Sequence, residues 1–554
     1  MHLIDWLFVV LPVVIVAAVT IYANRYLKSV ADFMSGGRLA GRYLLSTARS
    51  EMGAGAIGYV AMFEWFSHGG FPVTWWGQIA SPVGLIMAIT GFVIYRYRQT
   101  RALTLAQFFE MRYTRSFRLA TGILGFIAGV LNFGVIPVIG GKFMVHFLDL
   151  PQTIDLFSFT VPTYLVLMGG FLTITTLITI TGGQITVMMA DCIQGMISQI
   201  FYVIIGLFLI FIFSWPQTRA MLLSNPPGHS AVNPFESFST KDFNLGYVLI
   251  GIFGSVYGTM AWQNNQGFNS AAASPHESRM GYILGKWRGF ALGTTMLLLA
   301  VSAMTYLHQP EGQAVVQQRL AQIADPQTSE QMRLPIGLSE ILPIGIKGLL
   351  VSVVLMGILG GDGQHLHSWG SIFAQDVVLP LCKRPLSVRA HIILLRASII
   401  GVALFAFFFG ALFTQTEYLP MWFQRHHGNF RRRRGSGNHW RSLLEPRHYR
   451  RRMDRVDLGI DALNRRYSSP ATGMRQLFPR RNRPTGNVLR SLGPIHVESS
   501  WPQPASQRNG DRLFRHANGS GWLHSRFSFD LSHTSQHGSP APPGQIRGRA
   551  RGLE

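Results

Sequence analysis

Three polar residues lie side by side within a long apolar segment, residues 43–66: Arg49, Ser50 and Glu51. A charge near the centre of a bilayer costs roughly 2.5 to 3.5 kcal/mol, so we expect neither charged side chain to face lipid. Three glycines follow closely: Gly53, Gly55 and Gly58. Glycines weaken a helix, and a helix broken at membrane depth can hold an ion or a solute. The stretch therefore predicts a broken helix that lines a binding site.

The composition indicates the environment of this stretch. The chain has 554 residues, of which 48% are hydrophobic and only 14% are charged. Apolar runs of about 20 residues, the length that crosses the hydrocarbon of a bilayer, recur through the first three quarters of the chain. We therefore predict an all-α polytopic protein embedded in the lipid bilayer, and the composition argues against a soluble globular protein.

Ten membrane spans are predicted, and the loops between them alternate in their content of basic residues. The spans are 5–23, 44–64, 75–95, 118–141, 160–180, 190–214, 246–266, 288–307, 342–363 and 391–414. Lys and Arg concentrate in the odd-numbered loops, which by the positive-inside rule face the cytoplasm. We thus expect a multi-pass protein of the plasma or inner membrane with its N-terminus outside, and a partly helical outer segment over residues 308–339.

Three of these spans are expected to have irregular centres. The second contains Glu51, the seventh ends in a run of amides (Gln263, Asn264, Asn265 and Gln266), and the ninth ends in the glycine-rich residues 357–365. Irregular backbone at membrane depth is tolerated only where it lines protein or a cavity. Because the second and seventh spans are five apart, we predict inverted five-helix repeats with a site between their broken first helices.

The expected organisation has four parts. They are a first helix with its loop (1–43), a first five-helix repeat (44–214), an incomplete second repeat (215–424) and a basic tail (425–554). From the two broken helices, five polar residues are expected to contact a solute: Ser50, Glu51, Gln263, Asn264 and Asn265.

Four motifs in register resemble the sodium/solute symporter family. They are the segments Ala31–Arg38 (ADFMSGGR), Thr181–Gln194 (TGGQITVMMADCIQ), Ala271–Gly281 (AAASPHESRMG) and Leu366–Asp376 (LHSWGSIFAQD). Together they cover roughly residues 5–420 in the order of that family. The resemblance implies a leucine-transporter type of fold and the uptake of a small solute driven by sodium.

The resemblance also implies a cation site, with a departure from the family pattern. The family holds sodium with carbonyls of the first core helix, a carbonyl of the eighth and two adjacent serine hydroxyls. The matching positions here are Ala48, Glu51, Gly357, Gly360 and Gly361, so the serines are absent. Hard cations prefer oxygen ligands, which Asp362 and the Glu51 side chain would supply instead. An acid within the membrane also suits a proton as the coupling ion, so sodium and proton both stay open.

Several of these residues have alternative structural roles. Arg49 is expected to line the cavity or gate it, or to form a structural ion pair with Glu51. Asp191 is expected to anchor a helix end or a gate near the cytoplasm. The amides of residues 263–266 either meet the solute or satisfy the unwound backbone. Asp362 binds a cation or is structural.

The sequence changes character after Gln424. The first 424 residues carry a net charge of +6, whereas the last 130 carry +17, with 25 Arg and no Lys. Such a tail is expected to be disordered. Its codons permit a one-base shift that restores a stretch such as Ile-Ile-Gly-Gly-Leu-Tyr-Trp-Ser from Asn438, so we hypothesise a frameshift near residue 424. Arg without Lys or regular aromatic spacing argues against a nucleic-acid partner.

These observations predict a transporter and not an enzyme, with no cofactor beyond a sodium ion or a proton. The expected function is import of a small polar organic solute coupled to a cation. Two alternatives stay open, a membrane solute sensor that kept the fold without coupling and a non-functional frameshifted product.

Overall fold

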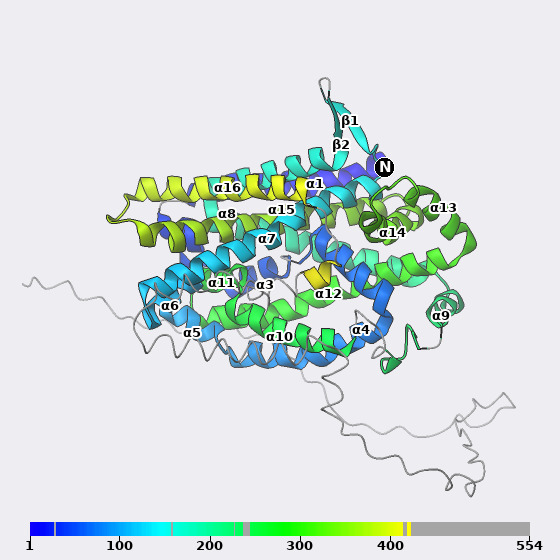
Figure 1. Ribbon diagram of the computed structural model, residues 1–554, viewed down its shortest axis with the longest axis horizontal. Coiled ribbons are helices and arrows are strands. Elements are labelled where there is room, and N and C mark those ends of the chain that lie inside the picture. The colour runs from blue at the N-terminus through cyan, green and yellow to red at the C-terminus, as the bar shows by residue number, and fades with distance from the viewer. Residues whose placement is uncertain are drawn as a thin grey trace, which may run out of the picture. The chain divides into compact units, whose positions relative to one another are not determined.

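The computed structural model describes residues 1–26, 29–51, 53–156, 159–226, 228–236, 244–413 and 418–422, and these are almost entirely helical (Figure 1). The predicted tail, residues 425–554, lies outside the described residues. The helices are α1 (Leu3–Ala23), α2 (Val30–Ser35), α3 (Arg42–Glu51), α4 (Ala56–Thr90), α5 (Ile94–Thr100), α6 (Leu105–Arg112), α7 (Arg115–Phe147), α8 (Thr163–Ile212), α9 (Trp215–Leu223), α10 (Leu245–Ala261), α11 (Gln263–Ala271), α12 (Pro275–His308), α13 (Pro310–Leu320), α14 (Pro326–Ile341), α15 (Ile346–Ile372) and α16 (Val388–Leu412).

Most predicted spans coincide with one helix or with part of one, whereas the second covers the end of α3 and the start of α4, and the seventh covers α10 and the start of α11. Within the described residues, seven helical segments are long and apolar enough to cross a membrane, and α10 is a shorter apolar helix. The helix α8 contains most of the fifth and sixth predicted spans, on either side of its interruption at Gly183, and α4, which is interrupted at Gly70, contains most of the third. The segment 308–339, for which partly helical structure was expected, is helical in α13 and α14.

One local expectation was wrong. The fifth predicted span begins at residue 160, but residues 159–162 form a β-strand instead. This strand, β2 (Phe159–Pro162), pairs antiparallel with β1 (Thr153–Leu156), and Ile154 lies opposite Val161. The β-branched residues Thr153, Ile154, Thr160 and Val161 favour such a hairpin, and the helix begins only at Thr163.

The helix α15 lies at the centre of the helical bundle. In its apolar window 83% of the residues are buried, compared with 28% for α1 and 33% for α16. It packs against α8, α1, α16 and α7 (Figure 1). Apolar side chains of α1 and α16 are exposed instead, including Leu7, Val14, Leu404 and Phe408. Exposed apolar faces around a buried central helix are what a lipid environment favours.

Glycine is required at the interruption of α8. Gly183 has φ +59° and ψ −142°, a conformation that essentially only glycine adopts. A Cβ atom placed there would lie 2.5 Å from the carbonyl oxygen of Phe33 in α2. The kink between the two halves of α8 therefore depends on this glycine and on its close contact with α2.

We predict that Gly183→Ala destabilises the protein by about 1–3 kcal/mol because of backbone strain, with the steric contact adding to this cost. Thermal unfolding of the full chain in detergent measures the change. Gly170→Ala is the matched control, because nothing lies within 4 Å of its Cβ position in the same helix. Alanine is the better helix former, so the control should be neutral or stabilising. Equal melting temperatures for the two variants would contradict the role assigned to Gly183.

Candidate functional site

The predicted break in the second span is present. The helix α3 ends at Glu51 and α4 begins at Ala56, while Met52 lies outside the described residues. The backbone N–H of Ala54 donates to the carbonyl oxygen of Glu51 at 2.9 Å, which turns the chain between the two helices. The last carbonyls of α3, from Ala48 onward, have no partner from a continuing helical turn. The break thus brings polar backbone into the interior of the bundle.

This break lies directly against α15. A Cβ atom at Gly357 would lie less than 2.5 Å from the carbonyl oxygen of Ala54 and 2.6 Å from the backbone nitrogen of Gly55. Backbone therefore packs on backbone, a distance that only glycine permits. A movement of the broken helix would therefore change this contact with α15.

The seventh predicted span is also broken, and its amides satisfy the broken backbone. The helix α10 ends at Ala261, and Trp262 separates it from α11. The side chain of Asn265 donates to the carbonyl oxygen of Gly258 at 3.0 Å, and Gln266 donates to that of Thr259 at 3.1 Å. These two bonds provide partners for carbonyls that the helix end leaves free. Two roles were considered for the amides. Asn265 and Gln266 have the structural role, because they provide hydrogen-bond partners for the unwound backbone.

The other two amides reach different elements. Gln263 accepts a hydrogen bond from the backbone N–H of Leu105 at the start of α6, at 3.0 Å. Asn264 accepts one from the hydroxyl of Ser368 in α15, at 2.9 Å. The Nδ2 atom of Asn264 is buried without a partner in the described part of the chain. Asn264 therefore has a buried donor that is available to a solute.

The third predicted irregular centre was wrong. The helix α15 continues from Ile346 to Ile372 through Gly357, Gly360 and Gly361. Glycine lowers helix stability by only about 1 kcal/mol per residue, and packing on all sides of this helix offsets that cost. These glycines thus do not break the helix, and Gly357 and Gly360 permit close approach to neighbouring elements.

A cluster of buried oxygen atoms lies between α3 and α8. Glu51 is 1% exposed and Asp191 is 2% exposed. Both carboxylate oxygens of Glu51, Oδ1 of Asp191 and Oε1 of Gln194 lack hydrogen-bond partners among the described residues. The Glu51 side chain lies against Gly195, where an added Cβ would be 2.8 Å from its Cγ. Ser198 lies beside Glu51, although neither carboxylate oxygen has a partner at hydrogen-bond geometry.

The oxygens of α8 occupy the space beside Gly360. A Cβ atom at Gly360 would lie less than 2.5 Å from Oε1 of Gln194 and 2.7 Å from Oδ1 of Asp191. The other oxygen of Asp191 accepts a hydrogen bond from Gln364 at 2.9 Å. Where the family resemblance leads one to expect a serine hydroxyl, this chain thus presents a carboxylate and an amide from the neighbouring helix. Asp191 lies within α8 and against α15, and not at a helix end.

Asp362 belongs to a different face of α15. Two residues along a helix correspond to a rotation of about 200°, so Asp362 points away from the face of Gly360 and Gln364. It lies on the side where Ile358 contacts Gly140 and His365 stacks on Phe133, both in α7. Its Oδ2 atom is buried without a partner among the described residues. The structure therefore does not bring Asp362 together with Glu51.

Arg49 does not pair with Glu51. Its Nη2 atom donates to Oδ1 of Asn269 at 2.9 Å, and its guanidinium lies 5.3 Å from the ring centre of Phe268 and 4.8 Å from that of Tyr282. These contacts connect α3 with α11 and α12, so the ion-pair alternative is not formed here. Arg42 strengthens the same connection through hydrogen bonds to Glu277 of α12, one of them 2.7 Å from its backbone N–H. The hydroxyl of Ser50 donates a hydrogen bond to the carbonyl oxygen of Thr47 in the same helix.

Two residues of the oxygen cluster were absent from the sequence-based site, Gln194 and Ser198. A signal was available, because positions 191, 194 and 198 follow the spacing of three and four that places residues on one face of a helix. Polar residues at this spacing within an apolar run predict a face turned toward the bundle interior.

Comparison with known proteins agrees with this architecture. The solved structure described as "Substrate-bound outward-open state of a Na+-coupled sialic acid symporter reveals a novel Na+-site" has a TM-score of 0.62 and 16% sequence identity to this chain. The match covers 77% of this chain and 85% of that one. No family model and no curated protein matches the sequence. The chain thus has the fold of a transporter, an all-α polytopic membrane protein.

We predict that Gly360→Ala displaces the Asp191 and Gln194 side chains, because the added methyl group would overlap their oxygen atoms. If these atoms hold a cation, the sodium concentration that half-maximally stabilises the full chain in a thermal-unfolding assay should rise by about tenfold or more, about 1.4 kcal/mol of binding free energy. Gly363→Ala is the matched control, since its nearest neighbours are at 3.5 Å, an ordinary contact. An unchanged sodium dependence in Gly360→Ala would rule out a cation at these oxygens.

Proposed function

We propose that this protein is a cation-coupled secondary active transporter that imports a small polar organic solute, and not an enzyme. The observation that carries this proposal is the cluster of buried oxygens of Glu51, Asp191 and Gln194 without partners in the described chain. An ionised carboxylate buried in an apolar medium is strongly unfavourable unless a cation or a proton neutralises it. The cluster is therefore built to exchange a cation.

The proposed cation site combines side chains with backbone. Glu51 and Asp191 supply carboxylates, and the backbone carbonyls of Ala48 and Glu51 lie at the end of the same broken helix. Gly357 lets α15 approach the broken helix and Gly360 lets it approach α8, while Gly361 is proposed to offer its backbone carbonyl. Asp362, on the face toward α7, would join only after a rearrangement of α15. Sodium is the first candidate because the donors are all oxygen, and a proton is the alternative.

The solute is proposed to lie beside the two breaks. Ser50 and Glu51 come from the first break, and Asn264 offers its partnerless Nδ2 atom from the second. Trp262 lies there against Trp369, with ring centres 5.1 Å apart. Gln263 and Asn265, which hold backbone in this conformation, would contact solute only if those bonds open. An aromatic and amide surface suits a small polar organic molecule.

Coupling follows from the shared broken helix. A cation bound at Glu51 fixes the end of α3, and the same helix end borders the solute. One positive charge that moves inward across 100 mV releases about 2.3 kcal/mol, which is available to accumulate solute. Release toward the side of the basic loops requires α3 to leave α11 and α12, so Arg49 and Arg42 are proposed to close that end. The likeness in fold to a sodium-coupled symporter supports this assignment.

We predict that Glu51→Gln and Asp191→Asn each abolish most of the stabilisation that sodium alone gives to the full chain. Replacing a buried charged ligand removes about 1.5–3 kcal/mol, which corresponds to about tenfold to a hundredfold weaker binding. The measurement is the melting temperature in sodium chloride compared with choline chloride, since a ligand that binds only the folded state raises it. Glu311→Gln, an exposed acid on α13, is the matched control.

The same proteins, reconstituted in liposomes, distinguish the alternatives. Uptake of candidate solutes that follows an imposed sodium gradient supports sodium coupling, and uptake that follows a pH gradient alone supports a proton. Solute binding without accumulation would overturn the transport proposal in favour of a sensor. Neither binding nor uptake would indicate a non-functional product, and resequencing of the gene around residue 424 tests the frameshift hypothesis.

A further inference from the structure

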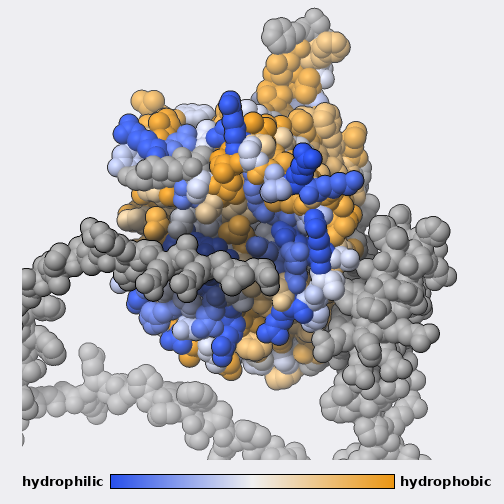
Figure 2. All heavy atoms as spheres, turned by 90° about the vertical axis from the view of Figure 1, so that its left-hand side faces the viewer, coloured by the Kyte–Doolittle hydropathy of each residue, from blue (hydrophilic) through white to orange (hydrophobic). Residues whose placement is uncertain are grey.

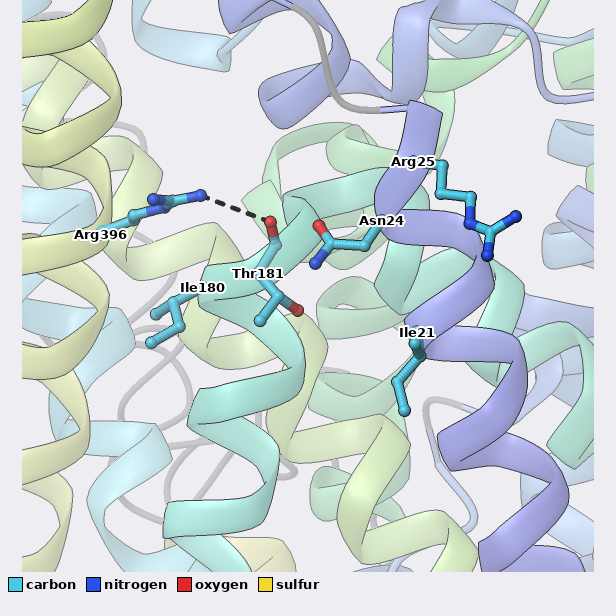
Figure 3. A pocket seen from close by; sticks show the side chains of 6 residues that line it. All are labelled: Ile21, Asn24, Arg25, Ile180, Thr181 and Arg396. Carbon is cyan, nitrogen blue, oxygen red and sulfur yellow. Dashed lines mark hydrogen bonds between the residues drawn. The ribbon is translucent and has the colours of Figure 1, made fainter.

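A cavity of about 590 Å³ lies between α1, α8 and α16, away from the oxygen cluster (Figure 3). Six residues line it: Ile21, Asn24, Arg25, Ile180, Thr181 and Arg396. Asn24 and Arg25 belong to the short 3-10 turn after α1, and Thr181 directly precedes the glycines that interrupt α8. The cavity thus lies beside the end of α1 and the kink of α8, and Arg396 reaches it from about two turns inside α16.

The cavity carries two positive charges and no acidic lining residue. The Nε atom of Arg396 is buried without a hydrogen-bond partner in the described chain, and its Nη2 atom is 3.5 Å from the carbonyl oxygen of Thr181. Arg25 lies over the ring of Tyr22, 5.6 Å from its centre. Neither arginine forms an ion pair with an acid among the described residues. An anion would supply the missing charge.

Three polar side chains of the lining lie toward one another, whereas Arg25 extends to the other side of the turn after α1 (Figure 3). Figure 3 shows Arg396 and Asn24 reaching toward Thr181 from opposite sides, from α16 and from the turn after α1. The guanidinium and the amide both provide N–H donors, which match the oxygen atoms of a phosphate group. A phosphate with three or more oxygens can engage donors from several helices at once.

The surroundings indicate how such a phosphate would be attached. Leu177 is 55% exposed one turn from Thr181 on the same face of α8, and Ile400 is 42% exposed one turn from Arg396 on the same face of α16. Ile21 of α1 is 72% exposed at the cavity itself. Apolar surface thus extends from the cavity along the lipid-facing helices. Figure 2 shows hydrophilic residues gathered on one face of the molecule and bordered by hydrophobic surface.

We propose that this cavity binds the phosphate headgroup of an anionic phospholipid, with the acyl chains lying along α8 and α16. Basic pockets between membrane helices on the cytoplasmic side are suited to anionic headgroups. The positive-inside rule assigns the loop that contains Arg25 to that side. A lipid bound there would contact α1, α8 and α16 together, next to the kink at Gly183.

The test is native mass spectrometry of the full chain with phosphatidylglycerol or phosphatidylcholine, compared with the double variant Arg25→Gln/Arg396→Gln. We expect the wild type to retain phosphatidylglycerol in preference to phosphatidylcholine, and the double variant to bind it about tenfold or more weakly. Arg96→Gln is the matched control, because Arg96 is an exposed arginine on a loop assigned to the same side. It should leave retention unchanged.

Three outcomes would overturn the proposal. They are equal retention of the two lipids by the wild type, unchanged retention by the double variant, and an equal loss in Arg96→Gln. Inorganic phosphate provides a further arm. If it displaces short-chain phosphatidylglycerol at equal concentration, the site takes free phosphate and not a lipid. Melting temperatures in phosphatidylcholine alone show whether the double variant is folded, so that loss of binding is separated from loss of structure.

Discussion

The contact on which the rest of this structure depends is that between Gly357 of α15 and the backbone at Ala54 and Gly55. Backbone can meet backbone at this distance only because the central helix has no Cβ atom at that position. The contact fixes the broken helix at the middle of the bundle. It also places the end of α3, and with it Glu51, beside α8 rather than beside lipid. The position of Glu51 in the site therefore depends on this contact.

The same principle explains the departure of the cation site from the family pattern. Gly360 leaves space that a serine side chain would fill, and Asp191 and Gln194 of α8 occupy it. The oxygen donors thus remain, although they come from another helix. In the proposed cation site these oxygens would be ligands together with the side chain of Glu51.

Much of the fold could be predicted from the sequence, because periodic apolar runs of fixed length and glycine-rich interruptions are local signals. The break after Glu51 was predicted for this reason, whereas the break at Trp262 was predicted from the run of amides that ends its span. The glycines of α15 were misread as a break because glycine serves two purposes, interruption and close approach, and the sequence does not distinguish them. Similarly, the amides at Asn265 and Gln266 left two roles open until their partners were known.

The sequence by itself determined that this chain crosses a membrane repeatedly and that Glu51 must face the interior, since the cost of a charge in hydrocarbon is a property of the residue and its neighbours. Only the tertiary structure decided which acids meet. Asp191 and Glu51 lie near each other, although more than a hundred residues separate them in the sequence. Asp362, two residues beyond Gly360, points toward α7 instead. The physical reason is that the rotation of a helix about its axis is set by the packing of its neighbours, and this information is distributed over helices that are distant in sequence.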